Sequence, residues 1–229
     1  MSDFDRVNCQ ELATKYPKYK TSNTMNITPS QLEQNGYMLQ DKLDHKELIP
    51  FIKEYLNRRG ITAFVYYGIN LAFLLIAIVM IIWNVEQKVI SIGDSIFHFF
   101  LGFSIAFLLI GIHEYIHVLA YRMMGAKETS LDMNLKKFYF LALADKFVAN
   151  RREFVFIALA PFTIISVVFA VLAAVLPFGW SMTMVGVLFA HTAMCSGDFG
   201  LLGYFEAHKG KEVVTYDDVE NKVSYFYSK

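Results

Sequence analysis

An uncharged stretch of 23 residues, Ile61 to Trp83, is the feature that most limits how this chain can fold. About 20 consecutive apolar residues are enough for a helix to cross the ~30 Å hydrocarbon core of a bilayer. A helix on a soluble protein keeps a charged or polar face, and this segment has no charged one. Only 18% of the whole chain is charged, against roughly 25% in average soluble domains. We therefore expect a membrane protein.

Three further apolar segments are long enough to cross a bilayer. The predicted fold class is mainly α, a polytopic membrane helix bundle with four transmembrane helices. The three segments run over about Ile96–Tyr121, Phe154–Phe178 and Trp180–Tyr204.

The rest of the chain divides around this core. Residues 1–60 are predicted as a cytoplasmic N-terminal region with short helices, residues 61–205 as the transmembrane core, and residues 206–229 as a cytoplasmic tail. One short helix is expected from Thr28, a helix-capping residue followed by proline, to Gly36. A second is expected around residues 51–56, ending before Gly60.

Charge and cysteine content exclude several classes of protein. The 21 lysines and arginines balance the 21 aspartates and glutamates, which argues against a nucleic-acid partner that needs a basic face. Two cysteines, Cys9 and Cys195, are too few for a disulfide-rich secreted scaffold. The expected partners are the lipid bilayer and a membrane protein or peptide, and the oligomeric state stays open.

The pattern His113-Glu114-Tyr115-Ile116-His117 carries most of the chemical information. Positions i and i+4 share one face of a helix, so both imidazoles can bind one metal ion. Zn²⁺ suits two histidines and a carboxylate with an open position for water, and the intervening glutamate can act as the general base. Ionisable residues at membrane depth are costly and are functional by default. We expect Zn²⁺ at His113 and His117, with Glu114 as the catalytic base.

The last apolar segment offers three candidates for a third ligand: His191, Cys195 and Asp198. At 1.5 Å per residue from the outer ends of their segments, Asp198 lies about 27 Å deep and His113 about 26 Å. His191 is only about 16 Å deep, and Cys195 is intermediate. Asp198 is therefore the predicted third ligand. For His191 an assisting role near the site and a purely structural role stay open.

The loop over residues 122–153 contains an alternation of apolar and polar residues from Leu131 to Leu135 that predicts a small β element. Two interpretations stay open for it. It is either an edge strand that pairs with an extended substrate segment or an interfacial loop that packs on the bundle.

Together these motifs resemble a known family. The His113–His117 motif, Ala160-Pro161-Phe162 and Ser196-Gly197-Asp198 are similar to bacterial membrane proteins described as zincin peptidases, whose layout is similar to that of the site-2 proteases, intramembrane zinc metalloproteases. The resemblance covers about residues 93–205. It implies His113, His117 and Asp198 as zinc ligands and Glu114 as base. The site-2 proteases have Leu-Asp-Gly at the third ligand, where this chain has Ser-Gly-Asp.

The sequence thus predicts a membrane-embedded zinc metallopeptidase that hydrolyses peptide bonds of membrane-associated substrates with zinc-activated water. The alternative is a non-proteolytic metal-binding membrane protein, such as a sensor, carrier or scaffold. Glu114 favours the enzyme, because a purely structural site needs no base.

The distribution of basic residues predicts the orientation. The five segments outside the apolar ones hold 9, 1, 7, 0 and 4 lysines and arginines in chain order. The positive-inside rule then places both termini and the 122–153 loop in the cytoplasm of a multi-pass protein of the cell membrane. Reporter fusions at Lys137 and Lys229 should both give a cytoplasmic signal. An external signal from either position would contradict this topology.

Overall fold

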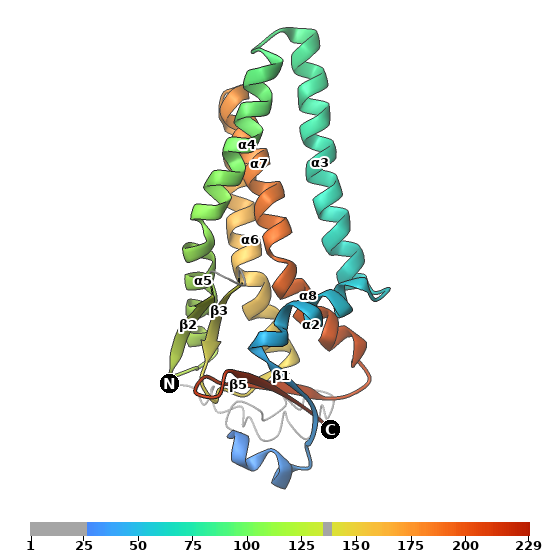
Figure 1. The fold of residues 1–229 in the computed structure, drawn as a ribbon, viewed down its shortest axis with the longest axis vertical. Helices are drawn as coiled ribbons and strands as arrows, with labels where there is room; N and C mark the ends of the chain where they lie inside the picture. The colour runs from blue at the N-terminus through green and yellow to red at the C-terminus, as the bar shows by residue number, and fades with distance from the viewer. Residues whose placement is uncertain (1–26, 135–138) are drawn as a thin grey trace, which may run out of the picture.

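The protein is elongated, as seen in a computed structural model that describes residues 27–134 and 139–229 (Figure 1). Four long helices, α3, α4, α6 and α7, run along its upper part, and short helices and a sheet close its lower end. Two of the long helices are long and apolar enough to cross a bilayer: α3 (Ile61–Gln87) and α6 (Arg151–Val175).

Two further apolar stretches are bent helix pairs. Helix α4 (Ile92–Leu108) meets α5 (Ile110–Met123) at 45°, and α7 (Phe178–Met194) meets α8 (Ser196–Ala207) at 46°. The described part of the chain therefore has two apolar spans, or up to four if each bent pair is one span. The second and fourth predicted segments are thus bent pairs of helices. The depths calculated for their residues assumed one straight helix in each segment, and the bends show that this assumption does not hold.

Both bends occur just before the predicted metal ligands. At the first bend the N–H of Leu109 bonds to the carbonyls of Ile105 and Ala106, at 3.0 and 3.1 Å. At the second bend, the N–H of Cys195 bonds to the carbonyls of His191 and Thr192, at 3.1 and 3.2 Å. Such bifurcated bonds tighten the end of a helix and let the chain change direction. Helices α5 and α8 therefore turn away from the axes of α4 and α7 where the predicted ligands begin.

Helices α4 and α7 approach closely through two glycines. A Cβ atom on Gly186 would lie 2.1 Å from the carbonyl oxygen of Phe99, and one on Gly102 would lie 2.4 Å from that of Thr183. Small residues let membrane helices pack backbone to backbone, where van der Waals contact is the main source of association. This contact fixes α7 against α4 above the two bends.

A four-stranded antiparallel sheet joins the two ends of the described chain. Its strand order is β1-β6-β5-β4, with β1 (Met38–Asp44), β6 (Val223–Ser228), β5 (Val213–Asp218) and β4 (Ala149–Asn150). Met38 pairs with Ser228 and Asp44 with Val223. The sequence predicted only short helices before residue 60 and a tail after residue 205. The prediction for these two regions was therefore incomplete, because β1, β5 and β6 form a sheet there.

Helix α2 (Leu48–Asn57) covers this sheet together with α8. The core between them is aromatic and aliphatic, and its largest members are fully buried: Tyr204, Phe205 and Phe226. The helix predicted from Thr28 to Gly36 is instead two short 3₁₀ turns, η3 (Pro29–Gln31) and η4 (Glu33–Asn35), and η5 (His45–Glu47) precedes α2.

The β element predicted in the 122–153 loop is present as a hairpin. Strand β2 (Thr129–Asn134) pairs with β3 (Tyr139–Ala144), with Thr129 opposite Ala144. The end of the predicted strand, from residue 135, lies outside the described residues.

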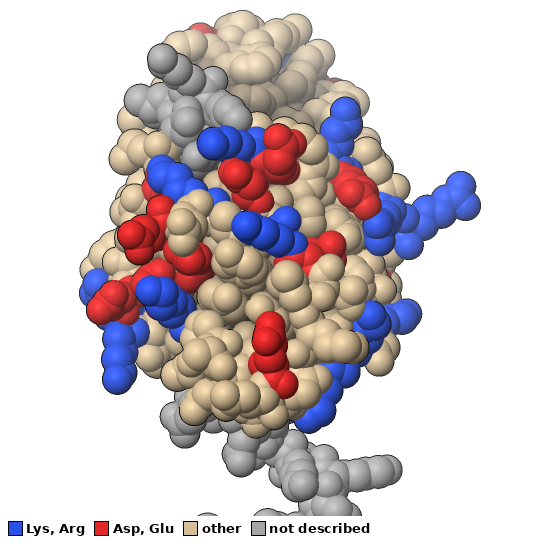
Figure 2. Space-filling model, turned by 60° about the horizontal axis from the view of Figure 1, so that its bottom comes forward, with Lys and Arg blue, Asp and Glu red and all other residues tan. Residues whose placement is uncertain are grey.

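The lower end of the molecule carries mixed charges and a carboxylate that caps the first long apolar helix. Figure 2 shows lysines, arginines, aspartates and glutamates interspersed over this end. The Glu206 carboxylate, near the end of α8, accepts hydrogen bonds from the N–H groups of Ile61 and Thr62 at 2.7 and 2.8 Å. It caps the first turn of α3, where unpaired N–H groups and the helix dipole favour a negative charge.

The α4–α7 contact gives a stability prediction. Gly186→Ala should destabilise the protein by about 1–3 kcal/mol, the usual cost of overpacking, because the new methyl group meets backbone atoms that cannot move away. Thermal unfolding in detergent measures the effect. Gly68→Ala in α3 is the control, since its Cβ meets nothing within 4 Å, and an equal loss in both variants would contradict the proposed contact.

Candidate metal centre

His113 and His117 lie one turn apart on α5, at the foot of the long helices. Both are almost fully buried, with 9% and 7% of their surface exposed. Their Nε2 atoms are 3.1 Å apart. The i,i+4 spacing therefore brings two imidazoles to one point, as the sequence predicted.

Asp198 reaches the same point from α8. Its Oδ2 atom is 3.3 Å from Nε2 of His113, and its Oδ1 atom is 3.1 Å from Nε2 of His117. Asp198 is the third residue of α8, so the bend at Cys195 directs the start of this helix toward α5. The structure thus brings the three predicted ligands together from two different helices.

The hydrogen bonds behind the histidines set their protonation. Nδ1 of His117 lies 2.9 Å from the carbonyl oxygen of Ile157 in α6, so this nitrogen carries the proton and donates it. In a neutral ring, Nε2 then presents a lone pair. Nδ1 of His113 lies 3.1 Å from Nε2 of His191, which allows the same arrangement with His191 as acceptor. The Nε2 lone pairs of both histidines and the Asp198 carboxylate would then point toward one another. Such an arrangement is electrostatically unfavourable without a cation between them.

These distances suit a zinc ion. Ligands about 2.0–2.2 Å from a tetrahedral zinc ion are separated from each other by roughly 3.3–3.6 Å. The three contacts among His113, His117 and Asp198 are 3.1–3.3 Å. Two imidazoles and one carboxylate would also leave a fourth position for water, as catalytic zinc sites do. The residues present therefore fit Zn²⁺.

Glu114 lies beside this group but belongs to neither of the candidate ligand sets in the described residues. It lines the same cavity as the three ligands, and its carboxylate accepts a hydrogen bond from the backbone of Ala142 in β3. A carboxylate next to a metal-bound water, held in place by a backbone donor, is suited to accept a proton.

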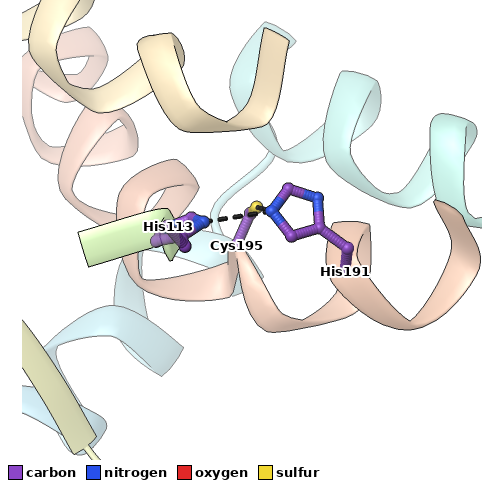
Figure 3. A group of neighbouring side chains, drawn as sticks. All are labelled: His113, His191 and Cys195. Carbon is purple, nitrogen blue, oxygen red and sulfur yellow. Dashed lines mark hydrogen bonds between the residues drawn. The ribbon is translucent and has the colours of Figure 1, made fainter. Parts of the chain in front are cut away.

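A second cluster shares His113 and is drawn in Figure 3: His113, His191 and Cys195. Nε2 of His191 lies 3.1 Å from His113 Nδ1 and 3.9 Å from the Cys195 sulfur. His191 is 1% exposed and Cys195 fully buried. His191 therefore contacts the side of the His113 ring that faces away from Asp198, a position from which it can orient a ligand.

The metal-ligand group opens on a cavity of about 420 Å³. One wall consists of α5, α6 and α8, and the other consists of β3, η5, α2 and the sheet. Sequence analysis missed three polar residues of the second wall, His45, Asp217 and Ser224. No local pattern marks them, because they come from opposite ends of the chain and meet only through the sheet.

Comparison with known proteins gives one match. Residues 106–209 match the family model described as "Putative zincin peptidase". The matched region contains all three candidate ligands and Glu114, and it supports a zincin-like metallopeptidase. No curated protein and no solved structure matches the chain.

The geometry predicts which residues hold the metal. Asp198→Ala should abolish stoichiometric zinc binding, because it removes the only carboxylate within reach of both histidines among the described residues. Cys195→Ala, a change at the neighbouring cluster, should retain zinc. Elemental analysis of the purified proteins measures this. Full zinc in Asp198→Ala together with its loss in His191→Ala would identify His191 as the third ligand instead.

Proposed function

We propose that this protein is a membrane-embedded zinc metalloendopeptidase that hydrolyses peptide bonds of membrane-associated substrates. The observation that carries the proposal is the convergence of His113, His117 and Asp198 beside Glu114, on one cavity at the foot of apolar helices. The match to the zincin peptidase model adds independent support.

The roles of the residues follow from their positions. His113, His117 and Asp198 would hold the zinc ion. When bound, zinc lowers the pKa of its water and polarises the substrate carbonyl. The Glu114 carboxylate accepts the water proton and passes it to the nitrogen of the leaving amine.

Strand β3 offers a place for the substrate backbone. Among the described strands it pairs with β2 only, and the Ala142 backbone group that bonds Glu114 belongs to its other edge. An unwound substrate segment would add to this edge as a further strand through the backbone groups that Glu114 and Asp217 do not contact. The cleaved segment would then lie extended across the metal centre.

The orientation predicted from the basic residues would put this chemistry near the cytoplasmic face. Both termini and the 122–153 loop would be cytoplasmic, and the cavity lies at the end of the molecule that carries the sheet. Water can then reach the site without crossing the hydrocarbon core, where no water is available.

The alternative is a metal-binding protein without proteolytic activity. Such a protein would need His113, His117 and Asp198 but would have no use for Glu114, which binds no metal in this arrangement. The two functions therefore differ in what they require of this one carboxylate.

Glu114→Gln tests the difference. The amide is nearly isosteric with the carboxylate but cannot accept the proton, so cleavage of a transmembrane peptide in liposomes should fall by on the order of 100-fold or more. Zinc content should stay at the wild-type level. His113→Ala should lose both zinc and activity.

Glu86→Gln, near the end of α3 and far from the cavity, is the matched control and should keep full activity. Wild-type cleavage rates in Glu114→Gln would contradict the peptidase. So would zinc-loaded wild type that cleaves no membrane peptide while Glu114→Gln retains full function in cells.

A further inference from the structure

The charges around the cavity do not balance. Three carboxylates line it, those of Glu114, Asp198 and Asp217, and no lysine or arginine is among its described lining residues. A zinc ion would contribute two positive charges and so compensate Glu114 and Asp198. Asp217 would remain as one uncompensated negative charge in a largely apolar cavity.

Asp217 lies on β5, on the wall of the cavity that the sheet forms. Its Oδ1 atom accepts a hydrogen bond from the Ser224 hydroxyl at 2.6 Å, and its carboxylate accepts another from the backbone of Ala144. It takes part in none of the five ion pairs found among the described residues. Two lysines on neighbouring segments pair with other carboxylates: the side chain of Lys146 contacts Asp145, and that of Lys222 contacts Asp132.

Burial, with a smaller contribution from the Asp145 carboxylate, raises the pKa of Asp217 to about 6, and the hydrogen bond from Ser224 opposes this shift. At neutral pH the group is therefore still mostly ionised. A buried, ionised carboxylate without a cation is costly, and such a group is normally paired or functional.

His45 adds a second acceptor beside this carboxylate. It is 2% exposed and lines the cavity, and its Nε2 atom is 3.2 Å from the Ser224 hydroxyl oxygen. Because that hydroxyl donates to Asp217, it accepts from His45, so Nε2 carries the proton. Burial lowers the pKa of His45, which keeps the ring neutral. Nδ1 then presents a lone pair, and it has no partner among the described residues.

We propose that Asp217 and His45 form a subsite that binds the side chain of a lysine or arginine of the substrate, close in sequence to the cleaved bond. The subsite offers only acceptors, and a guanidinium or ammonium group offers only donors. The apolar lining beside it, which includes Leu43, Leu48 and Phe226, can bury the aliphatic stem of such a side chain. The subsite rests on the proposed peptidase function and assigns a substrate class to it.

The cleavage test uses pairs of transmembrane peptides that differ only by lysine or glutamine, placed in turn at each position near the cleaved bond. For the wild type, one position should favour lysine by on the order of tenfold in kcat/KM, since pairing a buried charge is strongly selective. Asp217→Asn keeps the shape and the Ser224 bond but should reduce this preference to near unity.

Asp218→Asn is the matched control. It removes one negative charge at the neighbouring position, but the side chain of Asp218 does not line the cavity. It should keep the wild-type preference. A lysine preference that survives Asp217→Asn, or a wild type that shows none at any position, would overturn the subsite.

A binding measurement separates failure of the subsite from failure of the peptidase. Zinc-loaded Glu114→Gln and the double variant Glu114→Gln/Asp217→Asn are titrated with the same peptides. The single variant should bind the lysine peptide on the order of tenfold more tightly than the glutamine peptide, and the double variant should bind both alike. This result needs no cleavage. Equal affinities in the single variant would overturn the subsite even if the enzyme cleaves peptides.

Stability supplies a readout that is independent of any substrate. A carboxyl group with a raised pKa holds its proton more firmly when folded, so its ionisation above about pH 6 destabilises the folded state. Asp217→Asn should therefore raise Tm at pH 8, and the gain should shrink as the pH falls toward 5. A loss of Tm at pH 8 would mean that the carboxylate is structural, contrary to the proposal.

Discussion

Two imidazole nitrogens and one carboxylate meet at one point at the foot of apolar helices, and the rest of the structure depends on this contact. Ionisable groups in such surroundings are costly, and a cation held among these three would neutralise them. The bends at Leu109 and Cys195 turn α5 and α8 toward each other, the carbonyl of Ile157 orients His117, and His191 lies behind His113. Four helices, α5, α6, α7 and α8, thus contribute to holding one small polar group in apolar surroundings.

The lower end of the molecule does more than cover this centre. Strand β3 approaches Glu114 from one side, while η5 and the sheet close the cavity from the other. Helices α5 and α8 therefore carry the candidate metal ligands, and the strands, η5 and α2 would supply the surface against which a substrate lies. Catalysis and substrate selection would come from separate parts of the chain. The sheet and η5 could therefore change in sequence without altering the metal centre.

Local patterns in the sequence were enough to identify part of this arrangement. The i,i+4 spacing predicted that His113 and His117 share one face, and comparison of depths singled out Asp198, which does lie beside them. The bends at Leu109 and Cys195 were not predicted, although Gly111 and Gly197 follow them by two residues, because an isolated glycine is also tolerated within a straight helix. Strand β1 was missed for a different reason: it pairs with β6, almost at the other end of the chain, and such a long-range contact leaves no local signal. His45 and Asp217 were missed with it.

The cap that Glu206 places on α3 links the first apolar helix to the last one. A ribosome makes the chain from its N-terminus, so the first N–H groups of α3 meet this carboxylate only after a further 145 residues have been synthesised. Strand β1 likewise pairs with β6 only after the metal-ligand helices have been made. The sheet side of the cavity would therefore form later than the metal-ligand side. The order of synthesis would itself delay substrate binding until β6 has been added.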